Sequence, residues 1–362
     1  MKMKILDRYL IRQFLQTIVF GLIAFTALFV IIDLMENMDD FIDQSVPGNF
    51  IIEYYIMFVP EILRLMIPVA VLLACLFTVG KLSSQNELTS MKASGLSLYR
   101  FMMPFLATGL FISILATAFG GYVVPTANKH KVYIEQTYMK KGLVALGGNI
   151  IFQDSKTRIV NILSYSTFSQ QANRVSIHEF DEKYSTKMTS RIDANFMRYD
   201  SAANNWILNG GTKRTFTDSN ETAENFTTME LNNLNFKPDD IIKKQQKPEE
   251  QTLDELKEFA EERLRSGNDP TRIEIEYYSR YAFGFASLIV VFFGLPISAN
   301  KRKGGLAVQF GISLLVTFLY LVFMKVSQAF GKNGVMDPLI TAWFANFIFL
   351  FIGLVNLIRV QK

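Results

Sequence analysis

Six long apolar segments constrain this sequence more than any other feature. An α-helix rises about 1.5 Å per residue, so roughly 20 apolar residues cross about 30 Å of hydrocarbon. Segments of this kind occupy residues 14–32, 58–79, 101–124, 281–299, 306–325 and 339–358. Half of the residues are apolar but 19% are charged, which is typical of apolar helices interrupted by a soluble segment. The sequence therefore predicts a polytopic α-helical membrane protein with six transmembrane helices.

The lysine and arginine residues predict how these helices are oriented, because short cytoplasmic loops are enriched in both. Lys2, Lys4, Arg8 and Arg12 precede the first segment, whereas residues 33–57 contain no basic residue and six acidic ones. Basic residues also occur between segments two and three, between segments four and five, and at the C-terminus. We therefore expect both termini and these two loops in the cytoplasm. The first apolar run is longer than that of a signal peptide, so we expect it to be retained.

The polar interval between the third and fourth segments has the size of one domain. Short stretches rich in β-forming residues recur in it, separated by turn-forming runs. They are residues 150–152, 158–162, 175–180, 191–199, 206–208 and 226–231. This spacing predicts an antiparallel sandwich or an open barrel on the outer side of the membrane.

A helix is predicted near the end of this interval, over about residues 253–266. Thr252 and Glu255 form a T-x-x-E capping box at its start, and apolar residues recur on one face. The chain therefore divides into three expected parts. These are residues 1–125 with three helices, residues 126–279 as the β domain, and residues 280–362 with three more helices.

The sequence carries no recognisable catalytic motif. His130 and His178 have no second histidine nearby, and the single cysteine, Cys75, excludes both an intramolecular disulfide and a cysteine-based zinc site. It contains neither a G-x-S-x-G nucleophile turn nor a G-x-x-x-x-G-K-[ST] phosphate loop. Scattered basic residues with a net charge of +4 do not indicate nucleic-acid binding. We therefore expect no catalytic residue, no metal, no cofactor and no ATP site on this chain.

The loop between the second and third segments predicts a short amphipathic helix within about residues 84–95. Leu88 and Met91 are three residues apart, Glu87 lies near the start, where the helix dipole favours a carboxylate, and Gly95 is placed to end the helix. A short helix parallel to the membrane suits insertion into a groove on an ATPase, whereas a simple turn is the alternative. Glu87, Leu88, Met91 and Gly95 are therefore candidate ATPase-coupling residues.

Four cations lie in or beside the apolar segments and are candidates for binding an anionic lipid: Arg64, Lys129, Lys131 and Lys325. A charge in lipid is costly unless it is paired or hydrated. Each candidate also has an ordinary explanation. Arg64 is spaced to pair with Glu61, and the lysines can extend to the interface or lie in solvent.

The segment from Glu87 to Ser97, ELTSMKASGLS, resembles the E-(L/I)-x-x-(M/L)-x-A-S-G-(V/I/L)-S motif of the LptF/LptG permease family (YjgP/YjgQ type) of the lipopolysaccharide exporter. Weaker matches follow the family order along both membrane halves. They are LDRYLIRQFL at 6–15, IPVAVLL at 67–73, EYYSRYA at 276–282, PIS at 296–298 and PLITAWFAN at 338–346. One departure is that the family often has a proline soon after the arginine of the fourth match, where this chain has Phe283 and Gly284.

The resemblance implies a half-transporter in the inner membrane of a Gram-negative bacterium, with three helices, a periplasmic β-jellyroll and three more helices. It implies a homologous second permease as partner and a dimeric cytoplasmic ATPase that contacts Glu87. Lipopolysaccharide would be extracted from the inner membrane and passed to periplasmic jellyroll bridge proteins. The cofactor and the ATP site would then belong to the ATPase.

Two other classes of membrane protein have features in common with this chain. Permeases of the lipoprotein-release or mechanotransmission type place the large external domain after the first of four helices, whereas here it follows the third of six. A polytopic enzyme that modifies envelope lipids needs acid/base or metal-binding residues near the membrane, and the apolar segments offer little besides Glu61 and Arg64. The three-and-three division favours the transporter.

Overall fold

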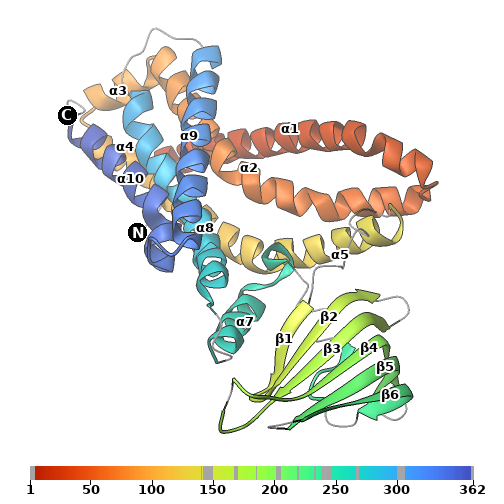
Figure 1. Cartoon of the computed structure of the whole chain (residues 1–362). Helices are drawn as coiled ribbons and strands as arrows, with labels where there is room; N and C mark the ends of the chain where they lie inside the picture. The colour runs from red at the N-terminus through yellow and green to blue at the C-terminus, as the bar shows by residue number, and fades with distance from the viewer. Residues whose placement is uncertain are drawn as a thin grey trace. The chain divides into compact units, whose positions relative to one another are not determined.

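The computed structural model describes residues 5–139, 141, 150–166, 170–184, 186–200, 205–217, 220–231, 234–238, 241, 247–265, 269–299 and 306–359. The chain forms two compact units. One combines Met1–Ile134 with Pro248–Lys362 and is helical, and the other, Glu135–Lys247, contains the β-sheet (Figure 1).

Among the residues that the structure describes, six helical stretches are long and apolar enough to span a membrane. They are α1 (Ile5–Asp43), α2 (Gly48–Ser84), the continuous run of α4 (Leu98–Ala118), η1 (Phe119–Val123) and α5 (Val124–Thr137), then α8 (Thr271–Ala299), α9 (Leu306–Lys332) and α10 (Pro338–Arg359). Each contains one of the predicted apolar segments. The six-helix prediction is confirmed.

The first helices are much longer than the apolar segments that identified them. α1 has 39 residues, which corresponds to about 58 Å against a hydrocarbon layer of about 30 Å. Residues 33–43 contain acids but no glycine or proline, so the helix continues through them. The helix α2 begins directly after the extended Pro47. The acidic loop expected over residues 33–57 is therefore mostly helix, with a turn at residues 44–47.

The helical unit has its largest core where α1, α2, α4 and α8 meet. Buried residues from each of these helices contribute to it, including Phe14, Leu72, Phe105 and Val291. A second cluster joins α8 with α9 and α10. The outward faces of α1 and α9 carry exposed apolar side chains, as expected of helices that face lipid or another membrane protein.

Gly284, at the position where the chain departs from the family pattern, lies against α4. A Cβ atom at this position would overlap Thr117 of α4, so glycine allows the two helices to approach closely. The helix continues without interruption through Phe283 and Gly284. The glycine thus serves the packing of α4 on α8.

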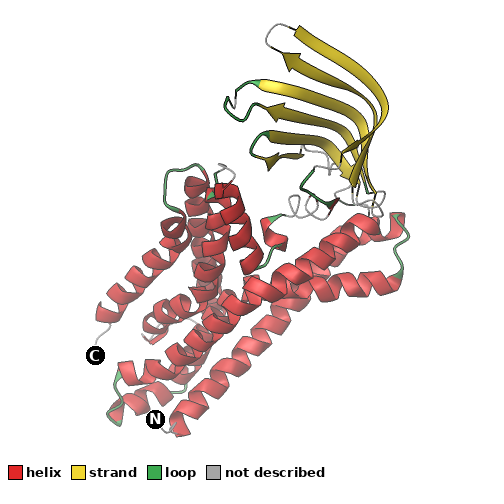
Figure 2. Cartoon of the chain, turned by 90° about the horizontal axis from the view of Figure 1, so that it is seen from below, coloured by secondary structure: helices red, strands yellow, loops and turns green. Residues whose placement is uncertain are grey.

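The described strands form one six-stranded sheet in which every neighbouring pair is antiparallel. The strands are β1 (Ile150–Ser155), β2 (Arg158–Ser166), β3 (Gln171–Phe180), β4 (Met188–Asp200), β5 (Asn205–Thr217) and β6 (Asn220–Leu231). They follow one another in sequence order, and the sheet is visibly curved (Figure 2). Each strand contains one predicted stretch, so the antiparallel β domain between two sets of helices is confirmed. Its single curved sheet is closer to the open-barrel alternative than to the sandwich.

One apolar face of the sheet holds the core of the β unit. Trp206 is 1% exposed, and its indole Nε1 donates a hydrogen bond of 2.8 Å to the carbonyl oxygen of Phe236. The Phe236 ring also packs edge-on against Phe152, with ring centroids 4.6 Å apart. The segment that follows β6 therefore covers part of the apolar face.

The unit that contains the sheet, Glu135–Lys247, is shorter than the expected domain of residues 126–279. The helix α7 (Leu253–Arg265) packs on α8 through Leu256, Ala260 and Ile273, and so belongs to the helical unit. The sequence analysis assigned all of residues 126–279 to one domain because this interval is polar. The structure differs because α7 buries its apolar face on a transmembrane helix.

The capping box predicted at the start of α7 is present. The backbone N–H of Thr252 donates to Glu255 Oε2 at 2.7 Å, and that of Glu255 donates to Thr252 Oγ1 at 3.3 Å. This reciprocal pair satisfies backbone donors that the helix start would otherwise leave without partners.

Candidate functional site

The short helix predicted within about residues 84–95 is present as α3 (Glu87–Ala93), between α2 and α4. Leu88 is 3% exposed and packs in the main core, and Met91 packs against the same core. Thr89, Ser90 and Lys92 are solvent-exposed. The helix is therefore anchored through one apolar face and presents a polar one.

Gly95 ends this helix in the predicted way. Its φ of 86° lies in the left-handed region, which favours glycine. The N–H of Gly95 bonds to the carbonyl of Lys92, and the N–H of Leu96 bonds to that of Met91. This is the Schellman pattern, in which the last helical carbonyls receive donors from the residues beyond the helix.

The Glu87 carboxylate contacts a residue that the sequence analysis did not select. Tyr9 donates its hydroxyl hydrogen to Glu87 Oε2 at 3.0 Å, and Gln13 Nε2 donates to the Tyr9 hydroxyl at 2.9 Å. Close by in sequence, Asp7 Oδ2 lies 2.6 Å from Arg100 Nη2, at the start of α4. Asp7 and Tyr9 both belong to the LDRYLIRQFL segment at residues 6–15, but no spacing rule predicts their contacts with residues 93 and 78 positions away.

These contacts place the start of α1 and the α3 loop at the same end of the helical unit. At the opposite end, His130 of α5 lies 2.7 Å from Glu53 of α2. The start of α1 and the α3 loop, which both carry basic residues, thus lie at the end of the helical unit opposite to Glu53 and His130. The basic loop with Lys301, Arg302 and Lys303 lies outside the described residues.

Two of the four candidate lipid-binding cations are paired with acids. Lys131 Nζ lies 3.1 Å from Glu61 Oε2, and Lys129 Nζ lies 3.8 Å from Glu255 Oε1. Glu61 thus pairs with Lys131, and the expected Glu61–Arg64 pair is wrong. Lys325 is exposed on α9, and no hydrogen bond or ion pair joins it to another described residue.

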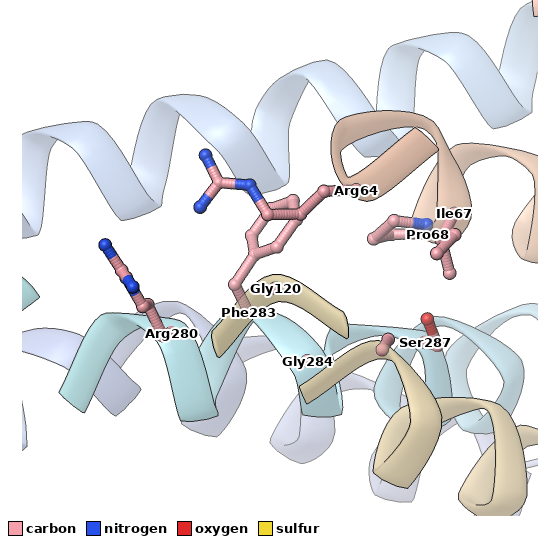
Figure 3. A pocket seen from close by; sticks show the side chains of 9 residues that line it. Arg64, Ile67, Pro68, Gly120, Arg280, Phe283, Gly284 and Ser287 are labelled. Carbon is pink, nitrogen blue, oxygen red and sulfur yellow. The ribbon is translucent and has the colours of Figure 1, made fainter. Parts of the chain in front are cut away.

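Arg64 lines a small pocket together with residues of α4, η1 and α8 (Figure 3). Its Nε atom is buried and has no hydrogen-bond partner among the described residues. Its aliphatic stem lies against Gly120, where a Cβ atom would be 3.2 Å from Arg64 Cδ. Gly120 belongs to the π-helical turn η1, a local distortion that often marks functional sites.

Arg280 lines the same pocket and is not among the residues that the sequence analysis selected. It is 5% exposed and donates hydrogen bonds to the backbone carbonyls of Pro248 and Gln251, just before α7. The position of Arg280 directly before an apolar segment was the sequence signal that could have identified it, because a charge at the edge of such a segment needs a partner. The four candidate cations thus do not converge on one point: Arg64 lies beside Arg280, Lys129 and Lys131 lie on α5, and Lys325 lies alone on α9.

Six spans interrupted by an antiparallel sheet, with a short anchored helix after the second span, define a permease-type subunit of a membrane transporter. No group of three or more metal-binding side chains occurs within the described ranges. The family model for the lipopolysaccharide export system permease LptF/LptG matches residues 8–359, and the chain belongs to this family.

The curated relatives agree with this assignment over almost their whole length. The chain is 20% identical to the lipopolysaccharide export system permease protein LptF of Escherichia coli K12, covering 97% of this chain and 94% of the relative. It is 21% identical to the corresponding LptG protein, with 98% of both chains covered. The LptF protein of Shigella flexneri is also 20% identical. The chain is thus about equally similar to both permeases.

Family membership assigns the function at the level of the transport system. The chain is a permease subunit of the lipopolysaccharide export system, a transport subunit rather than an enzyme, and an inner-membrane protein. The lipoprotein-release type of permease and the lipid-modifying enzyme are not favoured, because one family model covers nearly the whole chain.

Proposed function

We propose that this chain couples ATP hydrolysis by a dimeric cytoplasmic ATPase to the extraction of lipopolysaccharide, and that α3 is the helix that docks on the ATPase. The arrangement of α3 is the observation that supports this proposal most strongly. Leu88 and Met91 hold it on the core, while Glu87 and the neighbouring polar side chains remain accessible. Force applied to such a helix reaches the transmembrane core through its buried face.

The second permease is the partner that would complete the transporter. About equal similarity to LptF and to LptG supports pairing of two related chains, and the exposed apolar faces of α1 and α9 offer surface for it. We propose that both termini and α3 face the cytoplasm and that the β unit lies in the periplasm, where it passes lipid to jellyroll bridge proteins. The distribution of basic residues supports this orientation.

For the lipid phosphates, we propose contacts with the candidate cations Arg64, Lys129, Lys131 and Lys325. Arg64 and Lys325 have the strongest support, because neither has a carboxylate partner among the residues that the structure describes. A cation without a nearby acid can form a charge-assisted hydrogen bond to phosphate without first breaking an ion pair.

The docking proposal is tested with Glu87→Lys and Glu87→Gln. The chain is co-expressed with the second permease and the ATPase of the same export system, and assembly, ATP hydrolysis and lipid release are measured. We expect Glu87→Gln to reduce ATPase association and lipid release mildly, because it removes the negative charge. Glu87→Lys should reduce both strongly, because a positive charge at this position would also repel a cationic side chain of the ATPase. Asp43→Lys at the other end of α1 is the control and should assemble normally. Normal assembly and export with Glu87→Lys would refute the docking role.

A further inference from the structure

Tyr9 of α1 donates a hydrogen bond to the Glu87 carboxylate at the start of α3. The two residues are 78 positions apart, and the Tyr9 hydroxyl is 3.0 Å from Glu87 Oε2 and 3.4 Å from Oε1. Gln13 donates to the same hydroxyl from one helical turn further along. Because that donor occupies the acceptor side of the hydroxyl, the hydroxyl hydrogen is directed to the carboxylate.

This hydrogen bond leaves most of the carboxylate free. An ionised carboxylate has about four acceptor positions, and one phenolic donor uses one of them. Glu87 remains partly exposed beside Tyr9. The tyrosine thus restricts the rotation of the Glu87 side chain without occupying the positions that a cationic side chain would need.

A second contact from α1 holds the other side of the loop. The Asp7 carboxylate and the Arg100 guanidinium form an ion pair of 2.6 Å, with side chains 11% and 26% exposed. Arg100 lies in the first turn of α4, where its N–H bonds to the Oγ atom of the N-cap residue Ser97. The first turns of α1 therefore contact the loop both where α3 begins and where α4 begins.

An apolar base lies beneath these polar contacts. Leu10 and Phe14 of α1 are buried in one core with Leu88 of α3 and with Phe101 and Phe105 of α4. The rings of Phe14 and Phe105 are 5.1 Å apart. Close-packed side chains of this kind transmit displacement rather than absorb it.

We propose that Tyr9 is a positioning residue for ATPase coupling. It holds the Glu87 carboxylate toward a cationic side chain of the ATPase, and the Asp7–Arg100 pair keeps the first turns of α1 on the α3 loop. This inference rests on the proposed docking role of α3. It adds that α1 moves together with α3 when the ATPase moves, so that the first transmembrane helix receives the motion directly.

The test is a double-mutant cycle with Tyr9→Phe and Glu87→Gln in the assembled transporter. Tyr9→Phe removes the hydroxyl and keeps the ring, so thermal unfolding of the chain should change little. We expect it to raise the half-saturating ATPase concentration about 3- to 10-fold, since a hydrogen bond to a charged group is lost, and to raise the ATP hydrolysed per lipid released. In the Glu87→Gln background the same change should have little further effect. Tyr99→Phe, an exposed tyrosine at the same end, is the matched control.

The outcomes separate this inference from the docking proposal. If Glu87→Gln impairs coupling and Tyr9→Phe does not, the positioning role is refuted and docking stands. If the two effects simply add, Tyr9 acts independently of Glu87 and the positioning role is refuted as well. If neither Glu87→Lys nor Glu87→Gln has any effect, the docking proposal itself fails, and the positioning role fails with it.

Discussion

Lys131 and Glu61 form an ion pair of 3.1 Å between two helices that the sequence separates by 70 residues. The lysine Nζ also lies 5.1 Å from the centroid of the Phe58 ring, within the range of a cation–π interaction. With side chains 15% and 26% exposed, the pair is largely shielded from water. It joins α5 to α2 and leaves Arg64 without the acid that lies three residues before it in sequence.

The first prediction concerns this ion pair. Lys131→Glu should destabilise the chain by about 1–2 kcal/mol, because it removes a charged hydrogen bond and brings two carboxylates together. Exchange of both charges, in the double variant Glu61→Lys with Lys131→Glu, should restore much of the lost stability. Thermal unfolding in detergent measures both. Glu61→Lys with Arg64→Glu is the matched control, and recovery in that variant instead would mean that Arg64 is the true partner.

The second prediction concerns the close approach of α4 and α8. Gly284→Ala should lower the unfolding temperature markedly, because the added Cβ overlaps Thr117, and overpacking costs about 1–3 kcal/mol. Gly311→Ala in α9 is the control, since no atom lies within 4 Å of a Cβ built there. Equal unfolding temperatures for Gly284→Ala and the unchanged chain would show that the two helices are further apart than described.

The third prediction concerns orientation in the membrane. Single cysteines at Asp43 and Gln85, both exposed, should react with a membrane-impermeant maleimide differently in intact cells. The label should reach position 43 from the periplasm and position 85 only after the inner membrane is broken. The native Cys75 is fully buried and should give no background. Labelling of position 85 in cells with an intact inner membrane would contradict the orientation.

The fourth prediction concerns acid sensitivity of the β unit. Partial burial by itself would raise the pKa of Glu179, but hydrogen bonds from Arg158 and Ser190 and the nearby positive charges outweigh it, so the pKa is lowered. A lowered folded pKa means that Glu179 stabilises the unit above the usual glutamate pKa of about 4.3. That contribution is lost as the pH falls through the folded value.

Fluorescence of Trp206 can follow this transition in the full chain. Trp343→Phe removes the only other tryptophan. Glu179→Gln should lower stability at neutral pH and flatten its decline below about pH 4.3, because the titrating group is gone. Glu182→Gln, at an exposed position in the following turn, should leave the pH profile unchanged. An unaltered profile in Glu179→Gln would assign the acid sensitivity to other groups.

The sequence by itself determined the features that depend on neighbouring residues. Hydropathy located six spans, β-forming stretches between turn residues located six strands, and the signals at Thr252 and Gly95 marked a helix start and a helix end that the structure contains. These features follow from solvation and backbone geometry over a few residues, and so they can be derived from a short window of sequence.

Tertiary structure alone decided which distant side chains meet. The spacing of Glu61 and Arg64 favoured a local ion pair, but packing of α5 on α2 brought Lys131 closer to Glu61. The contact of Tyr9 with Glu87 and the buried position of Arg280 likewise depend on how whole helices pack. Many residues have the right charge to pair, and only the close packing of one helix on another selects the residue within hydrogen-bonding distance, because helices in a membrane associate through van der Waals packing and interhelical hydrogen bonds.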